Sequence, residues 1–204
     1  MKPDFIDRLY SNGLTYNQYV KRTIEDSEKV LPANASETEM HRHSLLKLNI
    51  QRMNRIDKTY SVSDELLSEM NKISEKQTWM IISEPWCGDS AQIIPVLAKI
   101  ALTNTLIELK IILRDENPDI MDLYVTPENK RSIPVLAVFD NENNELFRWG
   151  SRPVKAEQLV FELREKGAAK EVYLNKLHLW YSQNKGAELE KEILSLLIHN
   201  SIVI

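Results

Sequence analysis

The chain has 204 residues, of which 43% are hydrophobic and 27% are charged, and its formal net charge is −4. This length supports one substantial hydrophobic core with attached extensions better than two full-sized domains. Because basic residues are not in excess, the composition disfavours nucleic-acid binding through a broad phosphate-facing surface.

The sequence contains no stretch that approaches the roughly 20 apolar residues needed to span a membrane. The first residues also lack the basic segment and apolar run of a secretory signal. We therefore expect a cytoplasmic protein without a membrane partner. Cys87 is the single cysteine of the chain, so no disulfide can form within it and any thiol chemistry needs an external partner.

The first 76 residues have the pattern of three or four helices, with a break at residues 32–34. Two segments match the capping box, in which a hydroxyl and a side chain three residues later satisfy free amide groups at a helix start. These segments are Thr15 to Gln18 and Ser36 to Glu39. Ser63 precedes a further series of apolar residues at helical spacing, which predicts another helix start.

The periodicity changes at Thr78. Residues 79–82 form a short apolar run that is typical of a strand buried on both faces. A helix is predicted over residues 89–102 and a second strand over 106–113. A strand, a helix and a strand in this order predict a right-handed crossover between parallel strands.

The rest of the chain alternates between predicted helices and a hairpin. Asn117 and Pro118 look like a helix start, and residues 135–139 and 145–149 read as two strands joined by the turn cluster at 140–144. A helix is predicted from 154 to 166, and two further helices are separated by a stop at 184–186. We divide the chain into an N-terminal helical extension (1–76), a central domain (77–167) and a C-terminal helical extension (168–204).

Residues 78–166 resemble the thioredoxin family. The resemblance rests on the turn Trp86-Cys87-Gly88 between a buried strand and a helix, on Ile133-Pro134 before an apolar strand, and on Gly150 after the hairpin. It implies an α/β thioredoxin-like fold, with a central mixed sheet flanked by helices. It also implies that a cis peptide bond precedes Pro134, which lies against the sulfur of Cys87. The backbone of Ile133 would pair with a bound peptide.

The resemblance further implies that Trp86 is an exposed wall beside the sulfur and that Gly88 belongs to the substrate-binding turn. Two departures from the family pattern narrow the chemistry. Ser90 replaces the usual second cysteine, and Ile81 replaces the buried acid six residues before the first cysteine. These replacements exclude an ordinary dithiol reductase.

Monothiol chemistry remains, in which Cys87 attacks a disulfide and the Ser90 hydroxyl donates a hydrogen bond to the sulfur. The partners would be protein thiols or disulfides, or a low-molecular-weight thiol. We expect neither a cofactor nor a metal.

Opposing charges bear on the pKa of the Cys87 thiol. Free amide groups at a helix start favour the thiolate and alone lower a thiol pKa by about one unit. The carboxylate of Asp89 acts in the opposite direction. Arg131 is the nearest candidate for a compensating cation if the fold follows the resemblance.

Three alternatives stand beside monothiol exchange. The first is a non-enzymatic binding module that uses the groove beside Ile133 and Pro134 for an extended peptide. The second is peroxide sensing by oxidation of Cys87 to the sulfenic acid. The third, an iron–sulfur monothiol glutaredoxin, is disfavoured because Trp86 stands where a basic residue is expected. The Gly-Gly and acidic pair of that group are also absent after the last strand.

Overall fold

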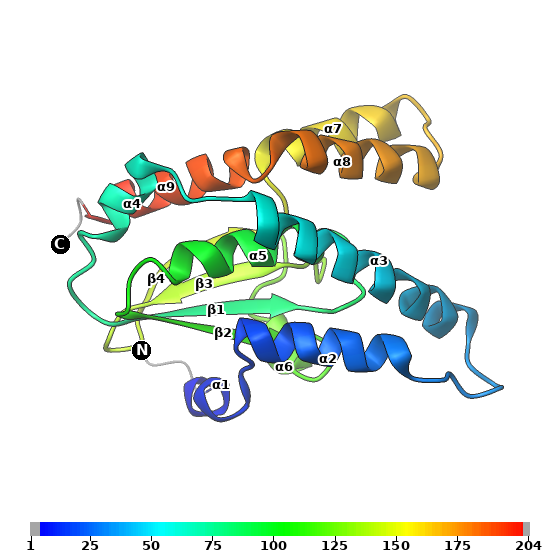
Figure 1. The fold of residues 1–204 in the computed structure, drawn as a ribbon, viewed down its shortest axis with the longest axis horizontal. Coiled ribbons are helices and arrows are strands. Elements are labelled where there is room, and N and C mark those ends of the chain that lie inside the picture. Colours follow the sequence, from blue (N-terminus) through cyan, green and yellow to red (C-terminus); the bar gives the residue numbers. More distant parts are fainter. Residues whose placement is uncertain (1–4, 202–204) are drawn as a thin grey trace.

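The computed structural model describes residues 5–201 of the chain. Its centre is a four-stranded mixed sheet in the order β2-β1-β3-β4 (Figure 1). The strands are β1 (Gln77–Ser83), β2 (Ile107–Leu113), β3 (Val135–Phe139) and β4 (Glu145–Gly150). β1 and β2 are parallel, whereas β3 pairs antiparallel with both β1 and β4. The predicted α/β class, the parallel crossover and the hairpin are therefore confirmed.

Helices lie on both faces of the sheet, and four of them precede β1. Those four are α1 (Ile6–Asn12), α2 (Tyr16–Glu28), α3 (Glu37–Thr59) and α4 (Asp64–Met70). The helices within and after the sheet are α5 (Ser90–Ala101), α6 (Pro118–Met121), α7 (Val154–Glu165), α8 (Lys170–Asn184) and α9 (Ala187–Ser201). No helix within residues 5–201 is long and apolar enough to cross a membrane.

Local sequence signals fix the starts of α2, α3 and α4. Thr15 and Gln18 form the predicted capping box of α2, and Ser36 and Glu39 form that of α3. The hydroxyl of Ser63 accepts a hydrogen bond from a backbone N–H in the first turn of α4. Each such N-cap contributes about 1 kcal/mol to helix stability.

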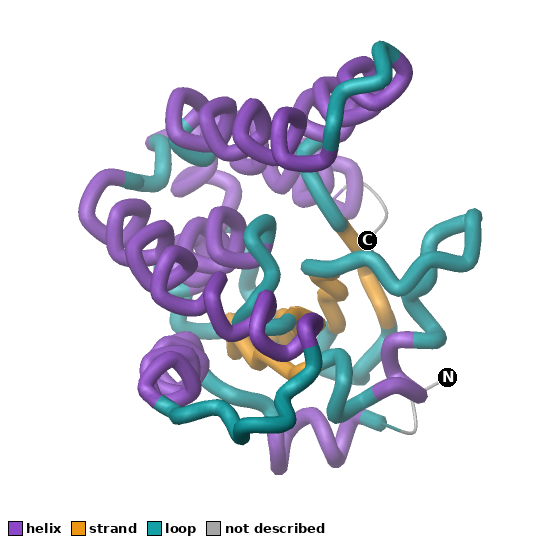
Figure 2. Tube along the Cα trace, turned by 90° about the vertical axis from the view of Figure 1, so that its right-hand side faces the viewer, coloured by secondary structure: helices purple, strands orange, loops and turns teal. Residues whose placement is uncertain are grey.

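The two faces of the sheet carry different coverings. On one face, strand residues such as Trp79, Ile81 and Leu136 pack against α2 to α5 and α7 to α9 in one large core. On the other face, strand residues such as Met80 and Ile82 pack against α1 and α6. Figure 2 shows the sheet between these helical layers.

The terminal helices share the core of the sheet instead of forming separate cores. Met53 and Ile56 of α3 and Leu177 of α8 belong to the same cluster of buried side chains as the strands. The division at residues 76/77 and 167/168 stays a prediction, and the outermost ends of its flanking segments, 1–4 and 202–204, lie outside the described residues.

Candidate thiol site

Cys87 lies in the turn that joins the end of β1 to the start of α5. Its backbone N–H donates to the carbonyl of Glu84 at 3.0 Å, and its own carbonyl accepts from the N–H of Ala91 at 3.2 Å. α5 begins at Ser90, one residue later than predicted. The side chain of Cys87 is only 8% exposed, so the turn presents a buried thiol at the start of a helix.

The sulfur of Cys87 faces the loop that precedes β3. Its thiol donates to the backbone carbonyl of Ile133, with an Sγ to O distance of 3.5 Å. The peptide bond between Ile133 and Pro134 is cis. The structure therefore brings Cys87, Ile133 and Pro134 together, and the Ile133 carbonyl is occupied by the thiol itself.

The pKa of the Cys87 thiol is raised to about 11, first because burial disfavours the thiolate and then because the Asp89 carboxylate repels it. The Ser90 side chain and the N–H groups of Asp89 and Ser90 lower the pKa, but these contributions are smaller. The lowering expected from the helix start is thus present but outweighed. The main cause of the raised pKa is the burial of the sulfur. The residues next to Cys87 in the sequence do not show this burial.

The hydroxyl of Ser90 is well placed to serve a thiolate. Ser90 is fully buried, and it lies close enough to Cys87 to lower the pKa of the thiol. Within residues 5–201, its oxygen has no hydrogen-bond partner of normal geometry. Its proton is therefore free to be donated to a charged sulfur.

Asp89 connects the turn to distant parts of the chain. The hydroxyl of Tyr181 in α8 donates to Oδ1 of Asp89 at 2.8 Å, and Arg152, which follows β4, pairs with Oδ2 at 2.9 Å. These partners are separated from Asp89 by more than sixty residues in sequence. Their residue types gave no signal of this role in the sequence.

The turn is also held by α3. The side-chain amide of the buried Asn49 donates to the carbonyl of Pro85 at 2.8 Å, and its oxygen accepts from Arg52 at 2.8 Å. A Cβ added at Gly88 would lie 2.9 Å from Cε1 of His178 and 3.1 Å from Nη1 of Arg52, so these two side chains would have to move to admit it. The turn is therefore packed between α3 and α8.

Trp86 differs from the expected exposed wall. It is half-buried, and the guanidinium carbons of Arg42 and Arg114 lie 4.4 and 4.9 Å from its ring centroid. Cations near an indole ring are attracted to its face. The aromatic wall beside the turn is thus already occupied by side chains of this chain.

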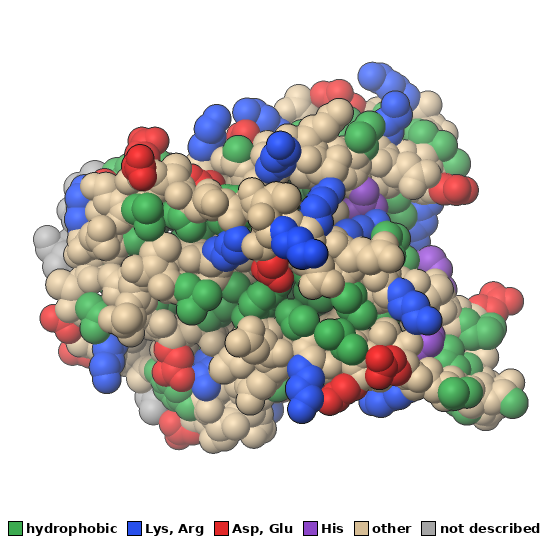
Figure 3. Space-filling model, viewed as in Figure 1, with side chains coloured by type: hydrophobic (Ala, Val, Ile, Leu, Met, Phe, Trp, Pro, Cys, Tyr) green, Lys and Arg blue, Asp and Glu red, His purple; other side chains and the backbone are tan. Residues whose placement is uncertain are grey.

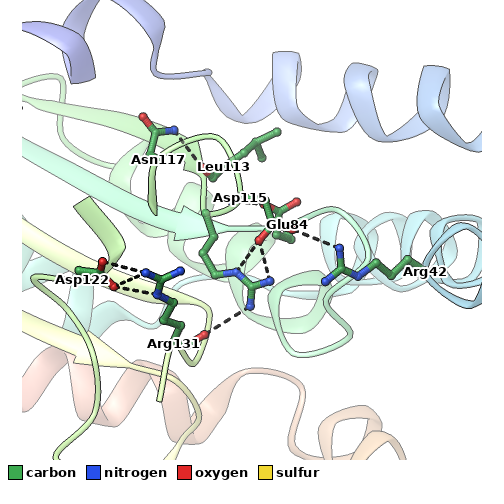
Figure 4. Close-up of polar contacts among 8 residues, drawn as sticks. Arg42, Glu84, Leu113, Asp115, Asn117, Asp122 and Arg131 are labelled. Carbon is green, nitrogen blue, oxygen red and sulfur yellow. Dashed lines mark hydrogen bonds and ion pairs between the residues drawn. The ribbon is translucent and has the colours of Figure 1, made fainter. Parts of the chain in front are cut away.

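Arg131 does not take the role expected of it. Its guanidinium forms two 2.7 Å hydrogen bonds with the carboxylate of Asp122 (Figure 4). The charge of a Cys87 thiolate acts instead on Arg52 of α3. The sequence could not indicate this, because Arg52 belongs to the extension outside the segment of resemblance.

Glu84 is a buried acid that sequence reasoning missed. It lies at the end of β1, and its Oε1 accepts from the backbone N–H of Asp115 at 2.8 Å; Figure 4 shows the two residues together. Burial raises the pKa of Glu84 to about 7. Its position directly after the apolar run of β1 was the one available signal. Glu84 and Trp86 also line a cavity of about 310 Å³ beneath the start of α3.

Comparison with known proteins identifies the family. The thioredoxin family model matches residues 36–170, more than half of the chain. The chain therefore belongs to the thioredoxin family. The match begins at residue 36 and so includes α3 and α4, which precede the segment on which the sequence resemblance rests.

Solved structures agree on the fold. A protein of unknown function from Pseudomonas aeruginosa is similar with a TM-score of 0.60 and 16% identity, over 94% of this chain and 95% of that chain. An HIV epitope-scaffold is similar with a TM-score of 0.58 and 18% identity, over 95% of this chain and 97% of that chain. No curated protein matches the chain significantly. The thioredoxin-like fold is thus shown, and the chemistry has to be argued from the site.

Proposed function

We propose that this protein carries out thiol–disulfide exchange through Cys87 alone. The observation that supports this function best is the position of the sulfur, which lies 3.5 Å from the carbonyl of Ile133 at the start of a helix. The Ser90 hydroxyl supports it as well, because its oxygen has no hydrogen-bond partner of normal geometry among the described residues. The partners are protein thiols or disulfides, or a low-molecular-weight thiol, in the cytoplasm.

The reaction proceeds in two balanced steps. The Cys87 thiol first loses its proton to solvent, and the thiolate attacks one sulfur of the substrate disulfide. A mixed disulfide forms, the substrate S–S bond breaks, and the departing thiolate takes up a proton. An external thiolate then attacks the mixed disulfide at the substrate sulfur, which releases a new external disulfide and the Cys87 thiolate. No second cysteine of the chain takes part.

The roles of the neighbouring residues follow from their positions. The Ser90 hydroxyl donates to the thiolate once the thiol proton has left, when the Ile133 carbonyl is no longer bonded to the sulfur. Ile133 and Pro134 then form one wall of the substrate site, and Trp86 together with the two arginines over its ring forms another. Gly88 keeps the turn free of a side chain next to the sulfur.

The raised pKa of Cys87 determines how fast the reaction is. With a pKa of about 11, only about one thiol in ten thousand is ionised at pH 7. Exchange with a simple disulfide is therefore slow at neutral pH. Its rate increases about tenfold for each pH unit until the pKa is reached.

The test is the formation of a mixed disulfide with 2-hydroxyethyl disulfide, followed by intact-protein mass spectrometry between pH 7 and pH 10. The expected result is a single adduct that forms faster at higher pH and disappears when a small thiol is added. Cys87→Ser is the control and gives no adduct. A folded protein that forms no adduct at pH 10 would contradict the proposal.

A second candidate function is a non-enzymatic peptide-binding module. Its specific support is a cavity of about 510 Å³ beside the edge strand β4, lined by Ser132, Val135 and Gly150 among others. An extended peptide can add to such an edge through main-chain hydrogen bonds. Binding of a given partner that is unchanged in Cys87→Ser and in the presence of reductant would favour this module. Binding that requires Cys87 and is reversed by reductant would favour exchange.

A further inference from the structure

A group of basic side chains lies above the start of α5. We call it the basic notch, and it consists of Arg52 and Arg55 from α3, Arg152 after β4, and His178 from α8. The helices α3 and α8 form its two sides (Figure 1). Figure 3 shows Lys and Arg side chains and a histidine gathered where the surface is hollowed between these helices. The Cys87 turn forms its floor.

The positive charge of the basic notch is incompletely balanced. Arg52 donates to the amide oxygen of Asn49 at 2.8 Å, and Arg55 donates to that of Gln92 at 2.7 Å. Both acceptors are neutral, and in the part of the chain that the structure describes neither arginine forms an ion pair. Two arginines that could each hold a carboxylate in their planar fork therefore have none.

The carboxylate nearest to the basic notch already has a partner. Asp89 pairs with Arg152 at 2.9 Å, and the second anionic partner of Arg152 is Glu157 at 2.7 Å. His178 is kept neutral, because burial and the neighbouring Arg52 lower its pKa to about 4. The notch thus remains short of negative charge.

The basic notch also borders the turn that carries Cys87. Nη1 of Arg52 would lie 3.1 Å from a Cβ added at Gly88, the residue directly after Cys87. A Cys87 thiolate, once formed, interacts favourably with the charge of Arg52. The buried hydroxyl of Ser90, which finds no hydrogen-bond partner within residues 5–201, lies in the first turn of α5. An anion in the notch would therefore lie within a few bonds of a sulfur that reacts with Cys87.

We propose that the basic notch binds the carboxylate of a small thiol or disulfide and so selects anionic substrates for Cys87. This inference rests on the proposed exchange function and names its substrate class. A small compound is favoured because α3 and α8 enclose the notch on both sides. A carboxylate two or three bonds from the sulfur matches the position of Arg52 beside Gly88.

The test uses three disulfides in which two methylene groups join each sulfur to an end group of different charge. They are 3,3′-dithiodipropionate, 2-hydroxyethyl disulfide and cystamine, which are anionic, neutral and cationic. The rate of mixed-disulfide formation at Cys87 is divided by the rate of the same disulfide with a free small thiol, which corrects for intrinsic reactivity. We expect this ratio to be highest for the anionic disulfide, lower for the neutral one and lowest for the cationic one. Each step should be about three- to tenfold at low ionic strength and smaller in high salt. Equal rates, or a preference for cystamine, would overturn the inference.

Arginine variants locate the effect. Arg52→Gln and Arg55→Gln should each reduce the ratio of the anionic to the neutral rate about threefold or more. Arg164→Gln removes the same charge from an exposed position on α7 and should leave the ratio unchanged. Gln can still donate to the neighbouring amide, and circular dichroism checks that each variant is folded. If the ratio of the anionic to the neutral rate fell equally in all three variants, the net charge of the protein alone would explain the preference. That result would contradict binding in the basic notch.

A second measurement separates this inference from the exchange function. Binding of 3-mercaptopropionate and of 2-mercaptoethanol to the Cys87→Ser variant is followed by NMR titration, in which no disulfide can form on the protein. The inference predicts tighter binding of the carboxylate compound, which is lost in Arg52→Gln. If wild type forms no adduct with any disulfide while this preference remains, exchange fails and the notch stands. No preference in this titration would overturn the notch.

Discussion

Replacement of Asp89 by Asn tests the electrostatic control of the thiol. The carboxylate of Asp89 raises the pKa of Cys87 and pairs with Arg152. Asn keeps an oxygen that can accept the 2.8 Å hydrogen bond from Tyr181, so the shape of the site is preserved. The charge of Asp89 disappears, and Arg152 loses one of its two anionic partners.

The size of the effect follows from Coulomb's law. Two unit charges roughly 6 Å apart in an effective dielectric of about 40 interact by about 1.4 kcal/mol, which equals about one pKa unit. The pKa of Cys87 should therefore fall from about 11 toward 10. Below both pKa values, the thiolate fraction at a given pH should rise about three- to tenfold. Loss of the ion pair with Arg152 should destabilise the fold by about 1–3 kcal/mol.

The assay is alkylation by iodoacetamide between pH 7 and pH 11, read by intact mass. Because Cys87 is the single cysteine, the groups added to wild type beyond those added to a Cys87→Ser control report on this thiol. The rate should rise with the thiolate fraction, and the curve of Asp89→Asn should lie at lower pH than that of wild type. Asp122→Asn, which removes an exposed carboxylate paired with Arg131, is the matched control. A folded Asp89→Asn protein that is alkylated no faster than wild type at pH 8 would refute the reasoning.

Three further substitutions probe the same region. Ser90→Ala should raise the pKa of Cys87 and slow alkylation at pH 8 several-fold, because a group that lowers the pKa is lost; an unchanged rate would contradict the role of the hydroxyl. Gly150→Ala should lower the urea-unfolding free energy by at least about 2 kcal/mol, because its φ is +152° and a Cβ would lie 2.6 Å from the Pro134 carbonyl; wild-type stability would disprove this. The pKa of Glu84 is raised from 4.5 to about 7, so the folded protein binds this proton more tightly than the unfolded chain does. As the pH rises from 4.5 to 7, the free energy of unfolding should therefore fall, and above pH 7 this contribution should stay level. In urea titrations Glu84→Gln should lack this fall and gain up to about 3 kcal/mol over wild type at pH 8, but not at pH 4; parallel pH curves would argue against it.

Much of the fold was predictable because its signals are local. The side chains of Thr15, Ser36 and Ser63 each accept a hydrogen bond from the backbone N–H three residues later. Both partners of each cap therefore lie at the start of the same helix. The strands follow from short apolar runs, and the crossover rule then determines that β1 and β2 are parallel. The short helix at Pro118 was also predicted, although it ends after four residues.

The site was predictable only in part. Cys87 and Pro134 could be placed from the resemblance, but the residues that surround the turn could not. Asn49 and Tyr181 lie in helices on either side of the segment of resemblance, and their contacts with the turn depend on how these helices pack. Periodicity shows that a helix has a buried face and leaves open what lies against it. The pKa of Cys87 depends on the same packing, so its direction could not be deduced from adjacent residues.

The hydrogen bond from Asn49 to the carbonyl of Pro85 makes Cys87 sensitive to local unfolding. Proteins open in segments with free energies below that of global unfolding, and an excursion of α3 away from α5 would break this bond and expose the sulfur. The alkylation rate of Cys87 would then follow the product of the opening equilibrium of α3 and the thiolate fraction whenever closing is faster than modification. The thiol is thus a built-in probe of how firmly the N-terminal helices are docked, with one chemical label and no engineered residue.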